Sequence, residues 1–146
     1  MDRDRFPVVV HVMLWRDAHL FLLRRGKTGF LDGFYALPGG HQHAGESVQD
    51  AAVRECKEET GTEIIVAHPL CTLPYLSGFQ QGVNFVFEAH YEAGDWTGDP
   101  YCAEPALFDR GDWFDPPALP DPVIPWIRDV LVMRSQGLWF REYRTR

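Results

Sequence analysis

Three glutamates in the middle of the chain, Glu55, Glu58 and Glu59, lie within a stretch of five residues. On a helix that turns by about 100° per residue, their carboxylates share one face, which continues an apolar stripe from the preceding turns. Like charges at this spacing destabilise a helix, and burial raises that cost. A hard divalent cation such as Mg²⁺ or Mn²⁺ would relieve the repulsion, because carboxylates on rigid elements suit such ions. The alternative is a solvent-exposed acidic face with Arg54 and Lys57 as partners.

The helix that presents these acids is predicted to span residues 48–60. Ser47 has a side chain that can cap its start, and Asp50 supplies an acid in the first turn. Gly61 fits the left-handed conformation that ends many helices. The three carboxylates are therefore expected on a short helix with well-defined ends.

Patterns of apolar residues predict β-strands over much of the remaining chain, so the expected class is α+β. The expected elements are strands at residues 8–15, 19–25, 62–76 and 82–93, a glycine-punctuated loop at 26–40, a loop with a short strand near Trp113 at 94–122, a closing helix at 123–136 before Gly137, and a tail or edge strand at 138–146.

The length and charge of the chain limit its possible partners. A chain of 146 residues with a net charge of −7 suits one domain, at residues 1–146, without a broad basic surface. We therefore expect no binding of polymeric nucleic acid, while a metal or a local basic cluster would still allow a small anionic ligand. The first 15 residues resemble neither a secretory signal nor a membrane span. Three cysteines without metal-finger spacing suggest free thiols in a reducing cytosol: Cys56, Cys71 and Cys102. We expect a cytoplasmic monomer or homodimer with no membrane partner.

The spacing of the glycine, arginine and glutamate residues around the acids resembles the Nudix box. Gly40 is followed after five residues by Glu46, and after seven more by the run "RECKEETGT" at 54–62. Every charged and glycine position of that motif is filled, while Cys56 and Thr62 stand at two of its bulky aliphatic positions. These two departures concern packing more than chemistry.

Flanking segments are similar to MutT-type bacterial Nudix hydrolases and extend the resemblance to about residues 8–133. They are "TGFLDGFYALPGGH" before the box, and Glu-Pro, Trp-Phe and Leu-Pro after it. The resemblance implies an α/β/α sandwich around a mixed sheet, in a single domain. It also implies hydrolysis of a nucleoside diphosphate linked to another group, by attack of water on phosphorus.

The resemblance assigns a role to each acidic position of the box. Glu55 and Glu59 would be the main ligands of Mg²⁺ or Mn²⁺, with the backbone carbonyl of Gly40 as a further ligand. Glu58 would bind a second ion or take the proton from the attacking water. Arg54 would pair with a box glutamate and hold it in place, and Glu46 would support the ligands.

Residues outside the box complete the predicted site. Glu104 is the preferred additional metal ligand, because related sequences carry Glu-Pro before the Trp; Asp109 and Asp112 are its rivals. Arg24 or Arg25, at the end of the second strand, is expected to bind substrate phosphates, and alternation along the strand allows only one of them to do so.

Aromatic and imidazole groups near the box provide candidates for reading the base. Phe34 and Trp113 are the preferred stacking residues, although core packing is the alternative for each ring. Other candidates share the same loops: Phe30, Tyr35 and Phe114. His41 resembles the family's frequent Gly-His pair, with loop stiffening and catalysis as alternatives.

The predicted function is Mg²⁺-dependent hydrolysis of a nucleoside triphosphate to the monophosphate and pyrophosphate, as in MutT-like housecleaning. A nucleotide-sugar or dinucleoside polyphosphate hydrolase is the second enzyme hypothesis. A catalytically inactive nucleotide-binding module is the hypothesis from a different class; it conflicts with the presence of every box glutamate.

Overall fold

Strand β1 (Val8–Arg16) lies inside the main sheet of the computed structural model, which describes residues 1–145. It pairs in parallel with β7 (Gln80–His90) along most of its length. Its other edge is shared by two antiparallel strands. Near its start it pairs with β4 (Gly39–His41), and near its end with β2 (His19–Arg25). The glycines that precede the box are thus held against the start of β1.

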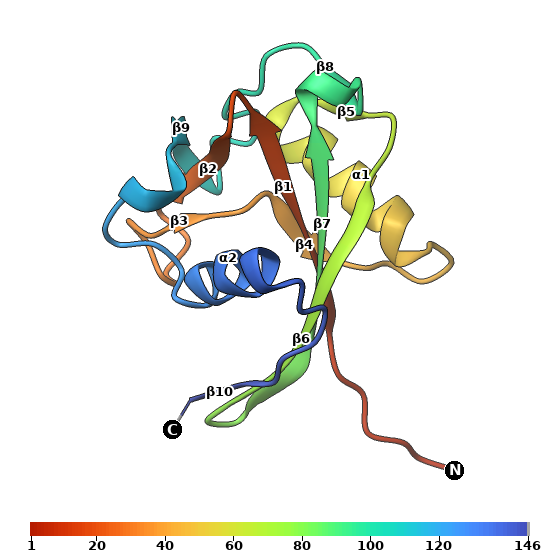
Figure 1. Ribbon diagram of the computed structural model, residues 1–146. Helices are drawn as coiled ribbons and strands as arrows, with labels where there is room; N and C mark the ends of the chain where they lie inside the picture. The colour runs from red at the N-terminus through yellow and green to blue at the C-terminus, as the bar shows by residue number, and fades with distance from the viewer. Residues whose placement is uncertain (146) are drawn as a thin grey trace.

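The remaining elements are β3 (Tyr35–Ala36), β5 (Glu63–Ile64), β6 (His68–Ser77), β8 (Trp96–Thr97), β9 (Phe108–Phe114), β10 (Tyr143–Thr145), η1 (Tyr91–Ala93) and η2 (Pro116–Ala118), besides two α-helices. The strands of residues 1–145 run in the order β10-β6-β7-β1-β2-β3 across the sheet, with β4 on β1 and β9 on β2. β6 and β7 form a long antiparallel hairpin whose turn extends beyond the helices (Figure 1).

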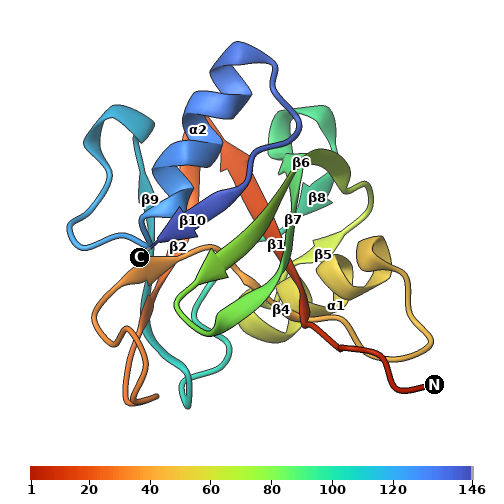
Figure 2. The ribbon, with the colours of Figure 1, turned by 90° about the horizontal axis from the view of Figure 1, so that it is seen from below.

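Helices α1 (Val48–Thr60) and α2 (Trp126–Gln136) cover opposite faces of this sheet (Figure 2). Successive side chains of a strand point to opposite faces. Val10 and Val12 therefore belong to the core cluster beneath α1, and Met13 belongs to the cluster beneath α2. The arrangement confirms the predicted α+β class and the α/β/α sandwich with a mixed sheet.

Helix α1 has the predicted ends. The Ser47 hydroxyl accepts a hydrogen bond from the backbone N–H of Asp50 at 3.0 Å, and Gly61 is left-handed with φ of 71°. Both signals are local, since each depends on residues within one turn of the helix end.

Two predicted elements have the wrong bounds. The strand expected at 62–76 is interrupted: the backbone N–H groups of Ile65 and Val66 both donate to the carbonyl of Asp95, which turns the chain between β5 and β6. The helix expected from residue 123 begins at Trp126, because Ile124 donates its N–H to Tyr35 and extends the sheet instead.

The loops contain more strand than predicted. The segment 26–40 includes β3 and the start of β4, and 94–122 includes β8 and the seven-residue β9. The strand expected at 82–93 runs from Gln80 to His90 and is followed by η1. β10 confirms an edge strand within 138–145, while residue 146 lies outside the described residues. No helix in 1–145 is both long and apolar enough to cross a membrane.

Candidate active site

Strand β4 and helix α1 approach one another through two glycines. The backbone N–H of Gly39 donates a hydrogen bond to Glu59 Oε2 at 2.9 Å. A Cβ added to Gly40 would lie 2.5 Å from the carboxyl carbon of Glu55, closer than van der Waals contact permits. The absence of side chains on β4 therefore lets its backbone lie directly against the carboxylates of the helix.

The three helix glutamates differ in burial. Glu55 and Glu59 are buried, with 9% and 3% of the whole residue exposed to solvent. The side chain of Glu58, in contrast, is 49% exposed. Burial raises the pKa of Glu59 to about 9, with smaller contributions from the charges of Glu55 and Glu104. Burial also raises the pKa of Glu55. The site thus concentrates more negative charge than its surroundings stabilise.

Glu104 is brought to this cluster by the last turn of α1. The final carbonyls of a helix lack partners within the helix. Here the N–H of Tyr101 donates to the Thr60 carbonyl at 3.1 Å, and the N–H of Ala103 donates to the Glu59 carbonyl at 2.9 Å. These bonds fix the following residue, and the Glu104 charge raises the pKa of both Glu55 and Glu59.

The rival acids of Glu104 point to other partners. Asp109 forms an ion pair with Arg24 at 2.7 Å, and Asp112 pairs with Arg110. The structure therefore places Glu104 near enough for its charge to act on Glu55 and Glu59, and it places Asp109 and Asp112 along strand β9 with arginines.

Arg54 links the helix to the loop that precedes it. Its guanidinium donates to both oxygens of Glu46, at 3.0 and 2.7 Å, and to Glu55 Oε1 at 3.0 Å. It also donates to the carbonyl of His41 at 3.0 Å and lies 3.3 Å from Glu58. This fork lowers the pKa of Glu46 to about 2 and raises that of Arg54. The expected pairing of Arg54 with a box glutamate is present, although the Cα of Arg54 lies on a different arc of the helix from the three glutamates.

The fit of a divalent cation depends on how these carboxylates are arranged. Within residues 1–145 no three His, Cys, Asp or Glu side chains are already placed around one point. Arg54 and the Gly39 N–H occupy oxygens of Glu55 and Glu59 instead. The donor set still suits Mg²⁺ or Mn²⁺, because hard carboxylate oxygens crowd a partly buried site and no side chain on Gly40 separates the strand from Glu55.

Arg24 and Arg25 diverge at an irregularity in the pairing of β2 with β9. Arg24 binds Asp109 on the exposed side. Arg25 donates to the Phe30 carbonyl at 2.8 Å and to Thr28 Oγ1 at 3.1 Å, and its charge lowers the pKa of Glu59. Of the two arginines, Arg25 is therefore the one whose charge acts on the buried acids.

Phe34 and Trp113 belong to opposite faces of the sheet. Phe34 packs on the cluster beneath α2, and Trp113 packs on the cluster beneath α1. The Trp113 ring lies 5.3 Å from Phe21 and 6.0 Å from Trp96, between centroids. The two rings cannot enclose one base together, so each stays a separate prediction. Among the other aromatic candidates, Tyr35 and Phe114 pack against each other with centroids 5.0 Å apart.

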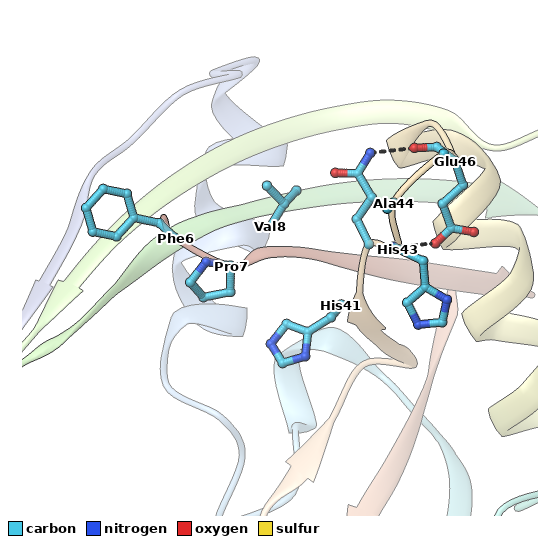
Figure 3. A pocket seen from close by; sticks show the side chains of 9 residues that line it. Phe6, Pro7, Val8, His41, His43, Ala44 and Glu46 are labelled. Carbon is cyan, nitrogen blue, oxygen red and sulfur yellow. Dashed lines mark hydrogen bonds between the residues drawn. The ribbon is translucent and has the colours of Figure 1, made fainter. Parts of the chain in front are cut away.

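A hollow of about 520 Å³ lies between the N-terminal segment and the loop before α1. Figure 3 shows Phe6 and Pro7 on one side and the loop that carries His43 and Glu46 on the other. His41 also lines this hollow. The loop is braced by Glu46, whose Oε1 accepts from the His43 N–H at 2.8 Å.

A polar pair inside the sheet was not predicted from the sequence. His11 on β1 and Asn84 on β7 are joined by a side-chain hydrogen bond of 2.8 Å. Both residues lie in segments that were predicted to be strands. They are 73 positions apart, so no local sequence pattern could relate them to each other. Only the parallel pairing of β1 with β7 brings them together.

Comparisons with known proteins agree with this geometry. The NUDIX domain family model matches residues 5–133. An RNA pyrophosphohydrolase of Erythrobacter litoralis is 30% identical over 67% of this chain and 69% of its own. An ADP-ribose pyrophosphatase of Methanocaldococcus jannaschii is 44% identical, over 37% of this chain and only 31% of the relative. The structure of a MutT NUDIX hydrolase from Burkholderia pseudomallei superposes with a TM-score of 0.79, at 27% identity over 88% of this chain and 98% of the other.

Proposed function

Because the chain belongs to the NUDIX family, we propose that it is a hydrolase that cleaves the phosphoanhydride of a nucleoside triphosphate to the monophosphate and pyrophosphate. The observation that carries this proposal is the cluster of Glu55, Glu59 and Glu104 against the Gly39–Gly40 backbone. Such a cluster suits a divalent cation, which would neutralise phosphate charge during attack by water.

In the proposed mechanism, Glu55, Glu59, Glu104 and the Gly40 carbonyl would hold Mg²⁺ or Mn²⁺. When bound, the ion would polarise the phosphate and lower the pKa of water. One water adds to phosphorus, the P–O bond of the anhydride breaks, and the proton of the water passes to a carboxylate. Glu58 is suited to take that proton, because it is the box glutamate that solvent reaches most easily.

Arg54 and Arg25 would support this reaction in different ways. Arg54 holds the loop, Glu55 and Glu58 in one ion-paired unit, so it would position the carboxylates. Arg25 uses Nε and Nη2 for the loop at 28–30, and within residues 1–145 Nη1 forms no hydrogen bond, so it could donate to a phosphate oxygen.

The proposed substrate is tested by assaying substrates at equal concentration with Mg²⁺ and measuring phosphate, pyrophosphate and monophosphate release. The set should contain nucleoside triphosphates, nucleotide sugars, ADP-ribose and dinucleoside polyphosphates. We expect a triphosphate to have the highest kcat/KM and to yield pyrophosphate. Much faster turnover of any other class would replace the substrate proposal without affecting family membership.

RNA ends form a separate arm of the same assay, because relatives are named RNA pyrophosphohydrolase and NAD-capped RNA hydrolase. The net charge of −7 weakens attraction to a polymer backbone. We therefore expect slower turnover of 5′-triphosphorylated and NAD-capped RNA than of free nucleotides, and faster turnover of either RNA would contradict that expectation.

Gly40→Ala should lower kcat/KM by about a hundredfold or more. The new Cβ would lie 2.5 Å from the Glu55 carboxyl group and push that ligand away. A displacement of about 1 Å at catalytic groups can cost about 10²-fold. The measurement is kcat/KM together with the thermal unfolding midpoint.

Gly111→Ala is the matched control for this variant. Its Cβ would lie 2.6 Å from the Phe21 ring, so it crowds the core to a similar degree away from the acids. Gly111→Ala should lose at least as much stability, because the Phe21 ring is packed in the core whereas the Glu55 carboxylate ends a flexible side chain, but only Gly40→Ala should lose most activity. Equal losses of activity would show that crowding alone explains the effect.

A further inference from the structure

The side chains of His11 and Asn84 meet on the face of the sheet that α2 covers. His11 Nε2 and Asn84 Oδ1 are 2.8 Å apart. A carboxamide oxygen can only accept, so Nε2 must carry the proton and Nδ1 must present a lone pair. Burial lowers the pKa of His11 to about 4, so the ring is neutral at physiological pH. The pair therefore offers one defined acceptor and one defined donor.

The remaining polar atoms of the pair lack partners in the protein. Within residues 1–145, neither His11 Nδ1 nor the side-chain nitrogen of Asn84 forms a hydrogen bond, and neither is among the polar atoms that are both unpaired and fully buried. A polar pair that served only to join two strands would gain more from satisfying these atoms inside the protein. Here an acceptor and a donor lie side by side, each without a partner in the described chain.

Aromatic rings flank His11 Nδ1 and the side-chain nitrogen of Asn84, which together form the polar edge of the pair. Trp126, the first residue of α2, packs edge-on against the His11 ring with centroids 4.5 Å apart. Trp126 and Phe34 both pack on the core cluster of the α2 face. A flat heterocycle with its own donor and acceptor would match the polar edge and could stack on a neighbouring ring.

Gly39 separates this polar edge from the carboxylates by the width of one residue. A Cβ on Gly39 would lie 2.9 Å from His11 Nδ1, while its N–H already donates to Glu59. No side chain of β4 therefore stands between the imidazole and the acids at this point. A ligand with a base at one end and phosphates at the other would span the two sites.

We propose that His11 Nδ1 and the Asn84 side-chain nitrogen read the hydrogen-bonding edge of the substrate's base on the α2 side of β1. His11 Nδ1 accepts from a base N–H, and Asn84 donates to the adjacent carbonyl or ring nitrogen. The phosphates then pass Gly39 to reach Glu55 and Glu59. This assignment rests on the proposed hydrolysis of nucleotides and names the residues that select among them.

The first test needs no variant. Nitrogen-15 NMR of the imidazoles should show His11 protonated at Nε2, with a free Nδ1. With Mg²⁺ present, saturating nucleoside monophosphate should shift the Nδ1 resonance as it accepts a hydrogen bond, whereas ribose 5-phosphate, which lacks a base, should not. An unchanged Nδ1 resonance in the presence of bound monophosphate would overturn the proposal.

The second test uses His11→Phe, which keeps a ring against Trp126 but removes both nitrogens. For the preferred triphosphate, KM should rise and kcat/KM should fall about tenfold or more, since a hydrogen bond between neutral groups contributes roughly one tenfold factor. The ratio of kcat/KM values among the four common bases should fall as well. Asn84→Ala should flatten the same ratio and serves if His11→Phe folds poorly.

His90→Phe is the matched control, because His90 stacks on Trp15 at the opposite end of β1, with centroids 6.4 Å apart. It should leave the base ratio unchanged. If the unaltered protein turned over triphosphates while His11→Phe and Asn84→Ala kept its base ratio, this inference would fail alone. If the unaltered protein neither hydrolysed nor bound any nucleotide, the proposed function would fail with it.

Discussion

Glu59→Gln is expected to lower kcat by about a thousandfold while the protein keeps its fold. The substitution removes a negative oxygen from the site that would hold the metal, and metal stabilisation of a phosphoryl transition state is worth several kcal/mol. A loss of about 4 kcal/mol corresponds to a thousandfold, since each 1.36 kcal/mol is a factor of ten. Glu59 is also the most buried acid of the cluster, so no neighbouring water can substitute for it easily.

The fold should tolerate this change because the hydrogen bond that the Glu59 carboxylate forms within residues 1–145 survives it. A glutamine oxygen can accept the 2.9 Å hydrogen bond from the Gly39 N–H as the carboxylate does. Glu59→Gln also removes a carboxylate whose negative charge would be repelled by the charges of Glu55 and Glu104. Metal-free unfolding free energy should therefore stay within about 1 kcal/mol of the original.

Glu63→Gln provides the comparison, because it makes the same chemical change in an exposed residue paired with Lys57. Steady-state kinetics and chemical denaturation of the three proteins give both quantities. If Glu59→Gln kept kcat within tenfold of the unaltered protein while Glu63→Gln did the same, the buried carboxylate would have no part in the reaction.

Features that depend on neighbouring residues could be predicted from the sequence. Helix α1 begins and ends as expected because Ser47 and Gly61 act within one turn. The crowding of Glu55 and Glu59 follows from helix geometry alone, and the structure buries both. Glu58 differs because it lies at the edge of the face, where the sheet does not cover it.

Features that depend on distant partners could not be predicted in the same way. β3 and β4 are too short for a periodic pattern and exist because β1 and β2 supply their partners. The resemblance predicts Glu104 as a metal ligand, but the backbone hydrogen bonds between its loop and the end of α1 depend on distant partners and cannot be predicted from a motif.

The base-reading residues show the same limit. Phe34 and Trp113 looked equivalent in the sequence, and only the packing of two separate core clusters assigns them to opposite faces. A histidine within an apolar strand is usually part of a satisfied core. His11 is a candidate because Asn84 fixes its tautomer and because Gly39, which packs against its second nitrogen, places no side chain there.

Removal of divalent cations should abolish hydrolysis, and Mg²⁺ or Mn²⁺ should restore it. In the structure, Arg54 and the Gly39 N–H are the main partners of Glu55 and Glu59, and neither can bridge these acids to a phosphate. Without a cation the carboxylates would repel the substrate. Ca²⁺ should restore activity poorly, because it takes more ligands at 2.3–2.6 Å, compared with roughly 2.0–2.1 Å for Mg²⁺.

A stability measurement separates metal binding from catalysis. A ligand that binds only the folded state stabilises it by about 2.7 kcal/mol at a concentration of 100 times its Kd. Mg²⁺ should therefore raise the unfolding midpoint of the unaltered protein and raise that of Glu59→Gln much less. Full activity after thorough chelation would refute metal dependence. Equal Mg²⁺ stabilisation of both proteins would place the ion away from Glu59, and the carboxylate cluster would then need another explanation.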